Sequence, residues 1–322
     1  MTNALVSVVI PTYRRPLALK NAINSVFMQS YKNLEIVVVD DNNSSDPLHH
    51  ETKRVVSCYS SVGKIIYLKQ EVQQGANAAR NAGILASNGE YIAFLDDDDV
   101  WFKEKLESQV MILKKDKHIG FVYCNMMIIY NGGKEVISNF NIDSCSFESL
   151  IERGEGVSTS TLMIRKSVLL EAGGFDETLE SYQDYDLLLR LSKTYSHALI
   201  KSPLLEYKVG LDGISMNYNS KFLGKERVLR KYKEDYIELD KASCYGMQMS
   251  LLAQYAILSG RRMKALRYYL ASVINRPAQI KSYLSLVIII VGGEWLYRKS
   301  VNFYYKTRKL SNLVSKKVES SY

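Results

Sequence analysis

The sequence predicts an α/β protein with a mainly parallel central sheet, followed by an α-helical C-terminal region. Two observations lead to this prediction. Over the first ~130 residues, short runs rich in Val and Ile alternate with segments of helical periodicity, which is typical of strand–helix–strand units. After about residue 220 the periodicity is helical only. We therefore expect one domain over residues 1–220 and a helical region over residues 221–322.

Four strands are expected first, because each is a short apolar run that ends at polar or turn-forming residues. They cover residues 5–10, 34–39, 64–68 and 91–95. The helices between them cover residues 17–28, a segment that starts at the capping residues 44–47, and residues 76–86. Ligands of such parallel sheets bind beyond the carboxyl ends of the strands. Polar clusters follow three of these strands, so a site is expected there.

The middle of the chain predicts a less regular continuation of this domain. Strands are expected over residues 120–130 and 158–164, and helices over residues 166–171 and 182–191. Three helices with apolar stripes then follow, over residues 221–239, 242–259 and 261–275.

The charge distribution is uneven. Residues 1–220 hold 22 Lys and Arg against 27 Asp and Glu, a net −5, whereas residues 221–322 hold 20 against 7, a net +13. A basic C-terminal region indicates a polyanionic partner, either nucleic acid or an anionic membrane surface. Since the sequence contains no recognisable nucleic-acid-binding motif, we expect the membrane surface and no nucleic acid.

Residues 282–293 carry no charge. As a helix they would extend ~18 Å, against ~30 Å for the hydrocarbon core of a bilayer. Two interpretations stay open here: a buried helix, or a helix that lies in a membrane interface. Trp295, Arg298 and Lys299 follow directly, and aromatic and basic residues suit the headgroup layer.

The four cysteines are scattered without a CxxC pair, which disfavours a zinc knuckle or a disulfide framework. The N-terminus lacks the basic segment of a secretory signal. We expect a cytoplasmic protein.

The strongest chemical signal is the run of four aspartates at residues 96–99, directly after the fourth strand. Adjacent carboxylates repel one another, and a divalent cation compensates that repulsion. Carboxylates together with substrate phosphates are the usual ligands of Mg²⁺ or Mn²⁺. The sequence thus predicts a Mg²⁺ or Mn²⁺ site, although a solvated acidic turn has the same composition.

Two weaker signals lie at neighbouring strand ends. Asp40 and Asp41 follow the second strand and could bind ribose or a base edge, and Arg80 lies on the helix after Gly75. Neither a GxGxxG motif after the first strand nor a GxxxxGK[ST] motif occurs, which disfavours a dinucleotide fold and a P-loop NTPase.

Six motifs occur together in one order. They are SVVIPTYR (7–14), VDDN (39–42), the segment 75–83, YIAFLDDDD (91–99), GGFDE (173–177) and QDYDL (183–187). In this order and spacing the chain resembles family 2 glycosyltransferases with the GT-A fold, over roughly residues 5–215. The resemblance implies an inverting enzyme that transfers a hexose-type sugar from a nucleotide-sugar, expected to be UDP-linked, to an acceptor hydroxyl.

The resemblance also implies roles for individual residues. The nucleotide site would include Pro11, Tyr13, Asp40, Asp41, Arg80, Asp96 and Asp97. Asp98 would bind the metal ion, and Asp184 would be the catalytic base. Gly174, Phe175 and Asp176 would shape the sugar and acceptor pocket. Asp186 or Glu180 could replace Asp184 as the base, since both are close to it in sequence.

One segment departs from the family pattern. Residues 207–215 contain no histidine where many relatives have one, so Lys208 or Ser215 would have to supply any third metal or phosphate ligand.

The implied acceptor is a glycan, lipid-linked, at the cytoplasmic face of the membrane, in the assembly of a surface polysaccharide such as O-antigen or capsule. Two other functions stay open. A nucleotidyltransferase shares a related fold but would carry a glycine-rich phosphate loop after the first strand, and a non-catalytic scaffold would bind a partner through the C-terminal helices.

Overall fold

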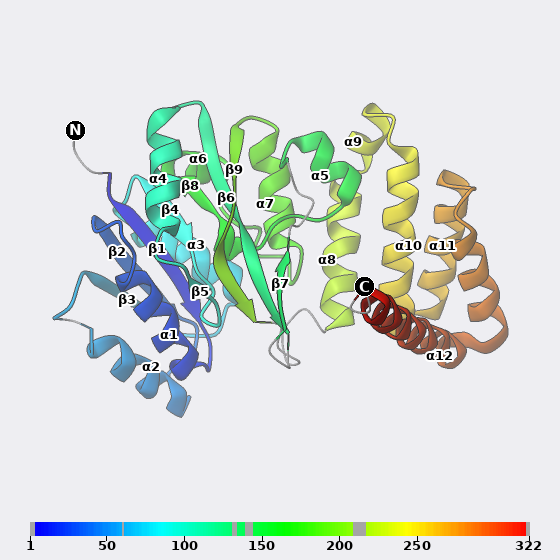
Figure 1. The fold of residues 1–322 in the computed structure, drawn as a ribbon, viewed down its shortest axis with the longest axis horizontal. Coiled ribbons are helices and arrows are strands. Elements are labelled where there is room, and N and C mark those ends of the chain that lie inside the picture. Colours follow the sequence, from blue (N-terminus) through cyan, green and yellow to red (C-terminus); the bar gives the residue numbers. More distant parts are fainter. Residues whose placement is uncertain (1–3, 60, 131–133, 139–143, 209–216, 320–322) are drawn as a thin grey trace. The chain divides into compact units, whose positions relative to one another are not determined.

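The structure is a computed structural model that describes residues 4–59, 61–130, 134–138, 144–208 and 217–319. It divides into two compact units, Met1–Gly213 and Ile214–Tyr322. The first unit is built on one mixed sheet, and the described residues of the second unit form helices (Figure 1).

The strands that open the chain run parallel to one another, as predicted. They are β1 (Val6–Thr12), β2 (Leu34–Asp40), β3 (Ile65–Lys69) and β4 (Tyr91–Phe94). Their order in the sheet is β3-β2-β1-β4, so β1 pairs with β2 on one side and with β4 on the other. The carboxyl ends of these strands consequently meet along one edge of the sheet.

The rest of the sheet mixes both directions. It contains β5 (Val100–Trp101), β6 (Ile119–Tyr130), β7 (Lys134–Ser138), β8 (Met163–Arg165) and β9 (Ser196–Lys208). β8 pairs antiparallel with both β4 and β6, whereas β9 runs parallel to β6 and pairs antiparallel with β5. This arrangement brings β9, from the end of the unit, towards the turn that follows β4.

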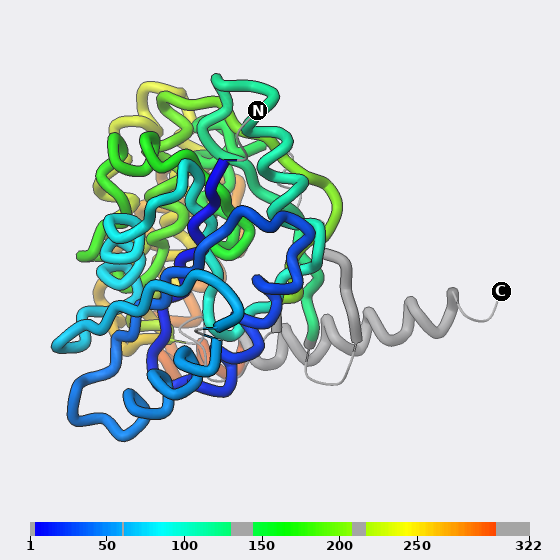
Figure 2. The backbone as a smooth tube through the Cα atoms, turned by 90° about the vertical axis from the view of Figure 1, so that its left-hand side faces the viewer, coloured from blue at the N-terminus to red at the C-terminus, as the bar shows by residue number. Residues whose placement is uncertain are grey.

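Helices cover both faces of this sheet. They are α1 (Pro16–Phe27), α2 (Pro47–Ser57), α3 (Ala76–Ala86), α4 (Lys105–Lys115), α5 (Phe147–Arg153), α6 (Lys166–Glu171) and α7 (Gln183–Ser192). Val8 and Val38 pack in one apolar core with side chains of α1, α2 and α4. Val9 and Val39 point to the opposite face, where α3 lies. In Figure 2 the N-terminal strand–helix units, coloured blue to cyan, face the viewer.

Gly83 lets α3 lie close against the sheet. A Cβ atom at this position would be 2.4 Å from Cγ1 of Val9 and 3.3 Å from Cγ2 of Val39, both of which are fully buried. Because a side chain cannot be accommodated at that distance, glycine fixes the separation between helix and strands. The N-terminal half of α3, with Arg80, is thereby held near the strand ends.

The second unit contains five helices among its described residues. They are α8 (Tyr218–Lys231), α9 (Lys233–Glu238), α10 (Ala242–Leu258), α11 (Arg262–Asn275) and α12 (Ile280–Glu319). α12 is interrupted at Gly293, whose φ of 58° and ψ of −151° are not helical. Within the described residues, the segment Ile280–Ser300 is long and apolar enough to cross a membrane, with a mean hydropathy of 1.4; core helices of soluble proteins pass the same test.

The structure corrects several predicted elements. The strand expected over residues 158–164 is a 3₁₀ turn (Thr159–Thr161) followed by the short strand β8. The helix expected over residues 221–239 is split at Tyr232 into α8 and α9. α4, α5, β5, β7 and β9 were not predicted.

Replacing Gly83 tests the close approach of α3. Gly83→Val should lower the free energy of unfolding by about 1–3 kcal/mol, because the added side chain overpacks a filled core. Leu85→Val is the matched control on the same helix, since Leu85 is 73% exposed, and it should change stability by less than about 0.5 kcal/mol. Urea unfolding measures both. Equal stabilities of the two variants would contradict the packing argument.

Candidate active site

Residues 96–99 form a tight turn directly after β4, which we call the acidic turn. The N–H of Asp99 donates to the carbonyl of Asp96 (3.1 Å), and the N–H of Asp96 donates to Oγ of Ser160 (2.9 Å). The turn separates the carboxylates into two pairs. Asp97 and Asp99 are buried, whereas the side chains of Asp96 and Asp98 are 32% and 52% exposed.

The buried pair is held by the surrounding protein. Thr12 at the end of β1 donates its hydroxyl to Asp97 (2.8 Å), and Nη1 of Arg15 lies 3.3 Å from the other oxygen of that carboxylate. Burial nevertheless raises the pKa of Asp97 to about 6. Burial, with the neighbouring charge of Asp96, also raises the pKa of Asp99 well above its usual value. Both side chains are thus enclosed by the protein around the turn, and a contact of Asp97 with the nucleotide stays a prediction.

Asp98 has the most exposed side chain of the acidic turn. It forms an ion pair with Arg15, whose Nη1 lies 2.5 Å from Oδ2 of Asp98. Its pKa is raised, first by desolvation and then by the charge of Asp96. Across the described residues, no group of three or more His, Cys, Asp or Glu side chains could hold a metal ion by itself. Since Mg²⁺ is usually bound through one or two carboxylates plus substrate phosphates, the donor set at Asp98 fits a metal that arrives with a diphosphate.

Arg80 connects α3 to the acidic turn. Its side chain is buried, and Nη2 lies 2.5 Å from Oδ1 of Asp96. Asn77 accepts a hydrogen bond from Nη1 (3.4 Å), and the guanidinium lies 5.4 Å from the ring centroid of Phe175. Arg80 thus neutralises Asp96 from a fixed position.

Asp184 lies in the first turn of α7, and the charges of Arg80 and Asp96 act on its carboxyl group. Burial raises the pKa of its carboxyl to about 6; Asp96 adds to this effect, while the N–H of Tyr185 (2.8 Å) and the charge of Arg80 oppose it. A carboxylate with a pKa near neutrality, beside an arginine and a second carboxylate, has the properties of a general base.

The two alternatives to Asp184 differ from it. Asp186 is fully buried and accepts a hydrogen bond from Nε of Arg190 (2.9 Å), whose Nη2 in turn donates to the carbonyl of Gly174 (2.7 Å). Asp186 therefore supports the turn before Phe175. Glu180 is exposed, whereas Asp184 is desolvated and the charges that act on it are those of Arg80 and Asp96.

The segment that contains Gly174, Phe175 and Asp176 is clamped by α3. Asn81 accepts from the N–H of Phe175 (2.8 Å) and donates to its carbonyl (2.9 Å), while Asn77 donates to the carbonyl of Asp176 (3.1 Å). Gly174 has a φ of +68°, and a Cβ there would be 2.5 Å from Oδ1 of Asn81, so glycine is required.

The ring of Phe175 is buried, packs edge-to-face on Phe94 (5.2 Å) and lies 5.4 Å from the guanidinium of Arg80, so it supports Arg80. The role of residues 174–176 in a sugar and acceptor pocket stays a prediction. The carboxylate of Asp176 accepts from the N–H and hydroxyl of Thr178 (3.0 and 2.7 Å) within its own loop.

Asp40 and Asp41 are adjacent in sequence but have different hydrogen-bond partners. Asp41 accepts the N–H groups of Gln74 and Gly75 (2.8 and 2.9 Å), which fixes the loop before α3, and burial raises its pKa. Asp40 is fully buried, and His49, Tyr67 and two nitrogens of Asn42 hydrogen-bond to its oxygens, at 2.6–2.9 Å. These bonds hold β2, α2 and β3 together, and a contact of Asp40 with the nucleotide stays a prediction.

Pro11 and Tyr13 flank the end of β1. Pro11 is buried in the strand, in register with Val39, whereas Tyr13 is 37% exposed. Of the two, Tyr13 therefore presents its side chain to solvent at this edge.

Sequence reasoning missed Arg15 and Tyr207. Tyr207 on β9 has a raised pKa, caused by desolvation and then by the charges of Asp99, Asp98, Asp96 and Asp184, so its phenol lies near the acidic turn. No local signal identifies it, because β9 was not predicted as a strand. The side chain of Lys208 and the whole of Ser215, the two candidates for a further ligand, lie outside the described residues.

Comparison with known proteins gives a consistent family. The sequence profile of "Glycosyl transferase family 2" matches residues 7–168, and that of "Glycosyltransferase like family 2" matches residues 135–241. The chain is 29% identical over 219 residues to the Escherichia coli UDP-Glc:alpha-D-GlcNAc-diphosphoundecaprenol beta-1,3-glucosyltransferase WfgD, covering 67% of this chain and 82% of WfgD. It is 31% identical over 212 residues to the amylovoran biosynthesis glycosyltransferase AmsB of Erwinia amylovora, covering 62% and 68%.

Solved structures share the fold. S. aureus TarS 1-349 in complex with UDP-GlcNAc superposes with a TM-score of 0.64 at 18% identity, over 94% of this chain and 92% of TarS 1-349. The mannosyltransferase PcManGT from Pyrobaculum calidifontis, in complex with GDP-Man and Mn²⁺, gives 0.56 at 16% identity, over 89% and 88%. The predicted GT-A fold with a helical C-terminal region is confirmed. With a family profile that matches half of its length, the chain belongs to glycosyl transferase family 2.

Proposed function

We propose that this chain is a divalent-metal-dependent, inverting hexosyltransferase that uses a UDP-sugar as donor. The observation that carries the proposal is that the charges of Arg80 and Asp96 act on Asp184, and that Asp96 belongs to the same acidic turn as Asp98. One carboxylate there is suited to accept a proton and another to bind a metal–diphosphate. The UDP-glucose named for WfgD and the UDP-GlcNAc bound to TarS support a uridine donor.

In this mechanism the acceptor oxygen attacks the anomeric carbon while Asp184 takes the hydroxyl proton. The bond between that carbon and the diphosphate oxygen breaks, its electron pair stays on the diphosphate, and attack from the opposite face inverts the configuration. A divalent cation at Asp98 would neutralise the leaving diphosphate, as Mn²⁺ accompanies GDP-Man in PcManGT. Arg80 holds the carboxylate of Asp96, which would contact the ribose, and lowers the cost of ionising Asp184.

The nucleoside would bind at the ends of β1 and β2. Tyr13 offers an exposed ring for contact with the base. Each oxygen of Asp41 accepts one backbone N–H, which leaves acceptor capacity for a donor on a uracil ring. Asp97, enclosed by Thr12 and Arg15, would act by shaping the turn.

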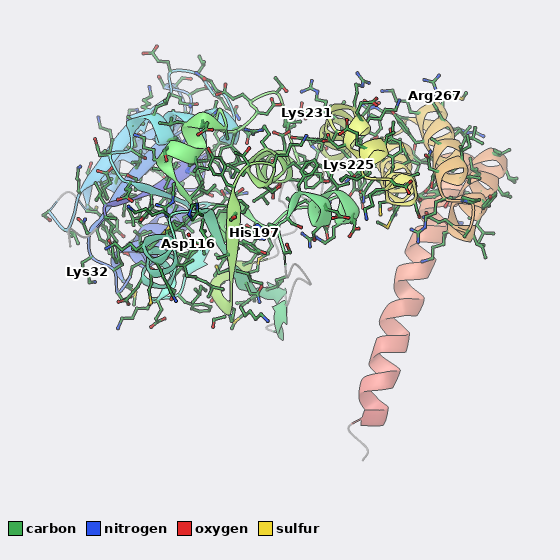
Figure 3. The ribbon with its side chains drawn as sticks, turned by 90° about the horizontal axis from the view of Figure 1, so that it is seen from above. Lys32, Asp116, His197, Lys225, Lys231 and Arg267 are labelled. Atoms are coloured by element: carbon green, nitrogen blue, oxygen red, sulfur yellow. The ribbon has the colours of Figure 1, made fainter. Side chains whose placement is uncertain are left out.

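We further propose that residues 1–220 are the catalytic domain and that residues 221–322 associate with the cytoplasmic face of an anionic membrane. The acceptor would then be a lipid-linked glycan in surface polysaccharide synthesis. WfgD is named for a diphosphoundecaprenol-linked acceptor and AmsB for amylovoran biosynthesis. The net charge of +13 over residues 221–322 favours an anionic surface. Lys231 on α8 and Arg267 on α11 are among its exposed cations (Figure 3).

α12 provides the apolar part of that contact. Ile280, Leu284, Val287 and Val291 recur at helical spacing on one face and are 58–77% exposed. On the opposite face Ser282 is buried and shares a hydrogen bond with Ser272 of α11 (3.0 Å). A helix tied to its neighbour along one face and apolar along the other is suited to lie in the interface instead of crossing the bilayer.

Donor turnover tests the reaction and its metal. Release of nucleoside diphosphate from a panel of UDP- and GDP-sugars should require Mn²⁺ or Mg²⁺ and stop in EDTA. Asp98→Asn should lower kcat about 100-fold or more, because stabilisation of the leaving group is lost. Glu104→Gln, an exposed acid beyond the turn, should keep wild-type activity. Full turnover in EDTA would refute the metal, and release of pyrophosphate would indicate a nucleotidyltransferase.

Asp184→Asn tests the base. It should lower kcat by about 10²–10⁴ with little change in donor affinity, since the base acts in the transition state. Wild-type kcat/KM should rise with pH through about 6, where Asp184 ionises, and the residual rate of the variant should lack that rise. Because a raised carboxyl pKa means that ionisation opposes folding at pH 7.5, the variant should melt no lower than wild type. Glu180→Gln serves as the control; its inactivity beside an active Asp184→Asn would reverse the assignment.

Liposome flotation tests the membrane contact. Binding should require anionic lipid and weaken with salt, since basic residues supply part of the attraction. Val287→Asp with Val291→Asp should abolish the salt-resistant part, whereas Leu85→Asp, an equally exposed apolar position of the first unit, should bind as wild type. If wild type ignores anionic liposomes at low salt, the surface binds a protein instead.

A further inference from the structure

Arg15 places a protein cation between two carboxylates of the acidic turn. A single nitrogen, Nη1, lies 3.3 Å from Asp97 Oδ1 and 2.5 Å from Asp98 Oδ2. The guanidinium therefore uses an oxygen of Asp98 that the proposed metal would need. Both side chains are accessible, at 44% for Arg15 and 52% for Asp98.

The backbone of Arg15 is fixed, so only its side chain can leave. Arg14 before it has a φ of +58° and donates its N–H to Oδ1 of Asn42 (2.9 Å). Pro16 after it starts α1, and the carbonyl of Arg15 accepts the N–H of Leu19 (3.0 Å). The first helical turn thus anchors the residue while the side chain stays at the surface.

The second arginine at the turn contrasts with Arg15. The side chain of Arg80 is 5% exposed, and Asn77 and Phe175 hold it in addition to Asp96. Arg80 is consequently a permanent partner of Asp96. The half-exposed Arg15 has two carboxylate contacts and no such enclosure.

We propose that Arg15 is a resident counter-cation that a divalent metal displaces from Asp98, and that the released guanidinium then binds the donor diphosphate. This rests on the metal use proposed above. Two cations cannot share one carboxylate oxygen without strong repulsion, so the metal alone binds weakly. A diphosphate brings negative charge and offers the guanidinium paired oxygens, which suit its planar donors. Metal and nucleotide therefore bind cooperatively through Arg15, and the apo protein keeps its acidic turn neutralised.

Titration of Mn²⁺, with free ion measured by electron paramagnetic resonance, tests this without turnover. In the absence of nucleotide, Arg15→Gln should bind Mn²⁺ about 2–5-fold more tightly than wild type, the size expected for removal of a half-exposed ion-pair partner. Added UDP should tighten Mn²⁺ binding strongly in wild type and much less in Arg15→Gln. Arg14→Gln is the matched control, since Arg14 pairs with Asp46 (3.2 Å) and not with the turn; it should behave as wild type.

The outcomes separate the two proposals. If wild type binds Mn²⁺ with UDP but Arg15→Gln binds the free ion no more tightly than Arg14→Gln, the displacement is overturned while metal use stands. If no variant binds Mn²⁺ with or without UDP, both are overturned. Should Arg15→Gln fail to fold by circular dichroism, Arg15→Lys decides. The lysine side chain is one bond shorter than the path to Nη1, so its ammonium pairs less closely with Asp98 and its Mn²⁺ affinity should exceed that of wild type; an unchanged affinity would overturn the displacement.

Discussion

Electrostatic repulsion within the acidic turn is the constraint on which the site depends. Four carboxylates follow one buried strand, and they cannot all ionise side by side without compensation, because they repel one another and two of them are buried. The protein separates them by burial and supplies an arginine from each side, Arg80 from α3 and Arg15 from the start of α1. The elements that deliver these arginines must therefore be held accurately against the strands.

α3 is the element on which most of these contacts converge. Gly83 brings it against Val9, the carboxylate of Asp41 fixes the loop at its start, and its side chains Asn77 and Asn81 clamp the segment before α7. The same helix carries Arg80. One helix thus connects the carboxyl ends of β1 and β2 to the segment that leads to Asp184, so that motifs far apart in the sequence lie against the same helix.

The sequence allowed the first four strands and the position of the acidic turn after β4 to be predicted, because each depends on local pattern. The role of Asp184 rests on a motif of the family and stays a prediction. Contacts across long separations were not predictable. Asp40 and Asp41 look alike in sequence, and only the distant partners His49 and Tyr67 distinguish them. β9 was not predicted because polar residues and Pro203 interrupt its apolar pattern. The segment forms a strand because it pairs with β6 and β5, which are distant in sequence. Tyr207 was missed with it.

The pair of Asp186 and Arg190 has a consequence for how mutational scans of such enzymes are read. Asp186 stands two residues from Asp184 within one motif, yet its carboxylate supports the turn at Gly174 through Arg190. Loss of either acid would register as loss of function in a screen scored by product alone, and Asp186 would be counted as catalytic. Protein abundance would distinguish them. Removal of Asp186 leaves Arg190 without its buried partner and should lower the amount of folded enzyme, whereas removal of Asp184, the proposed base, should leave a folded enzyme that is inactive.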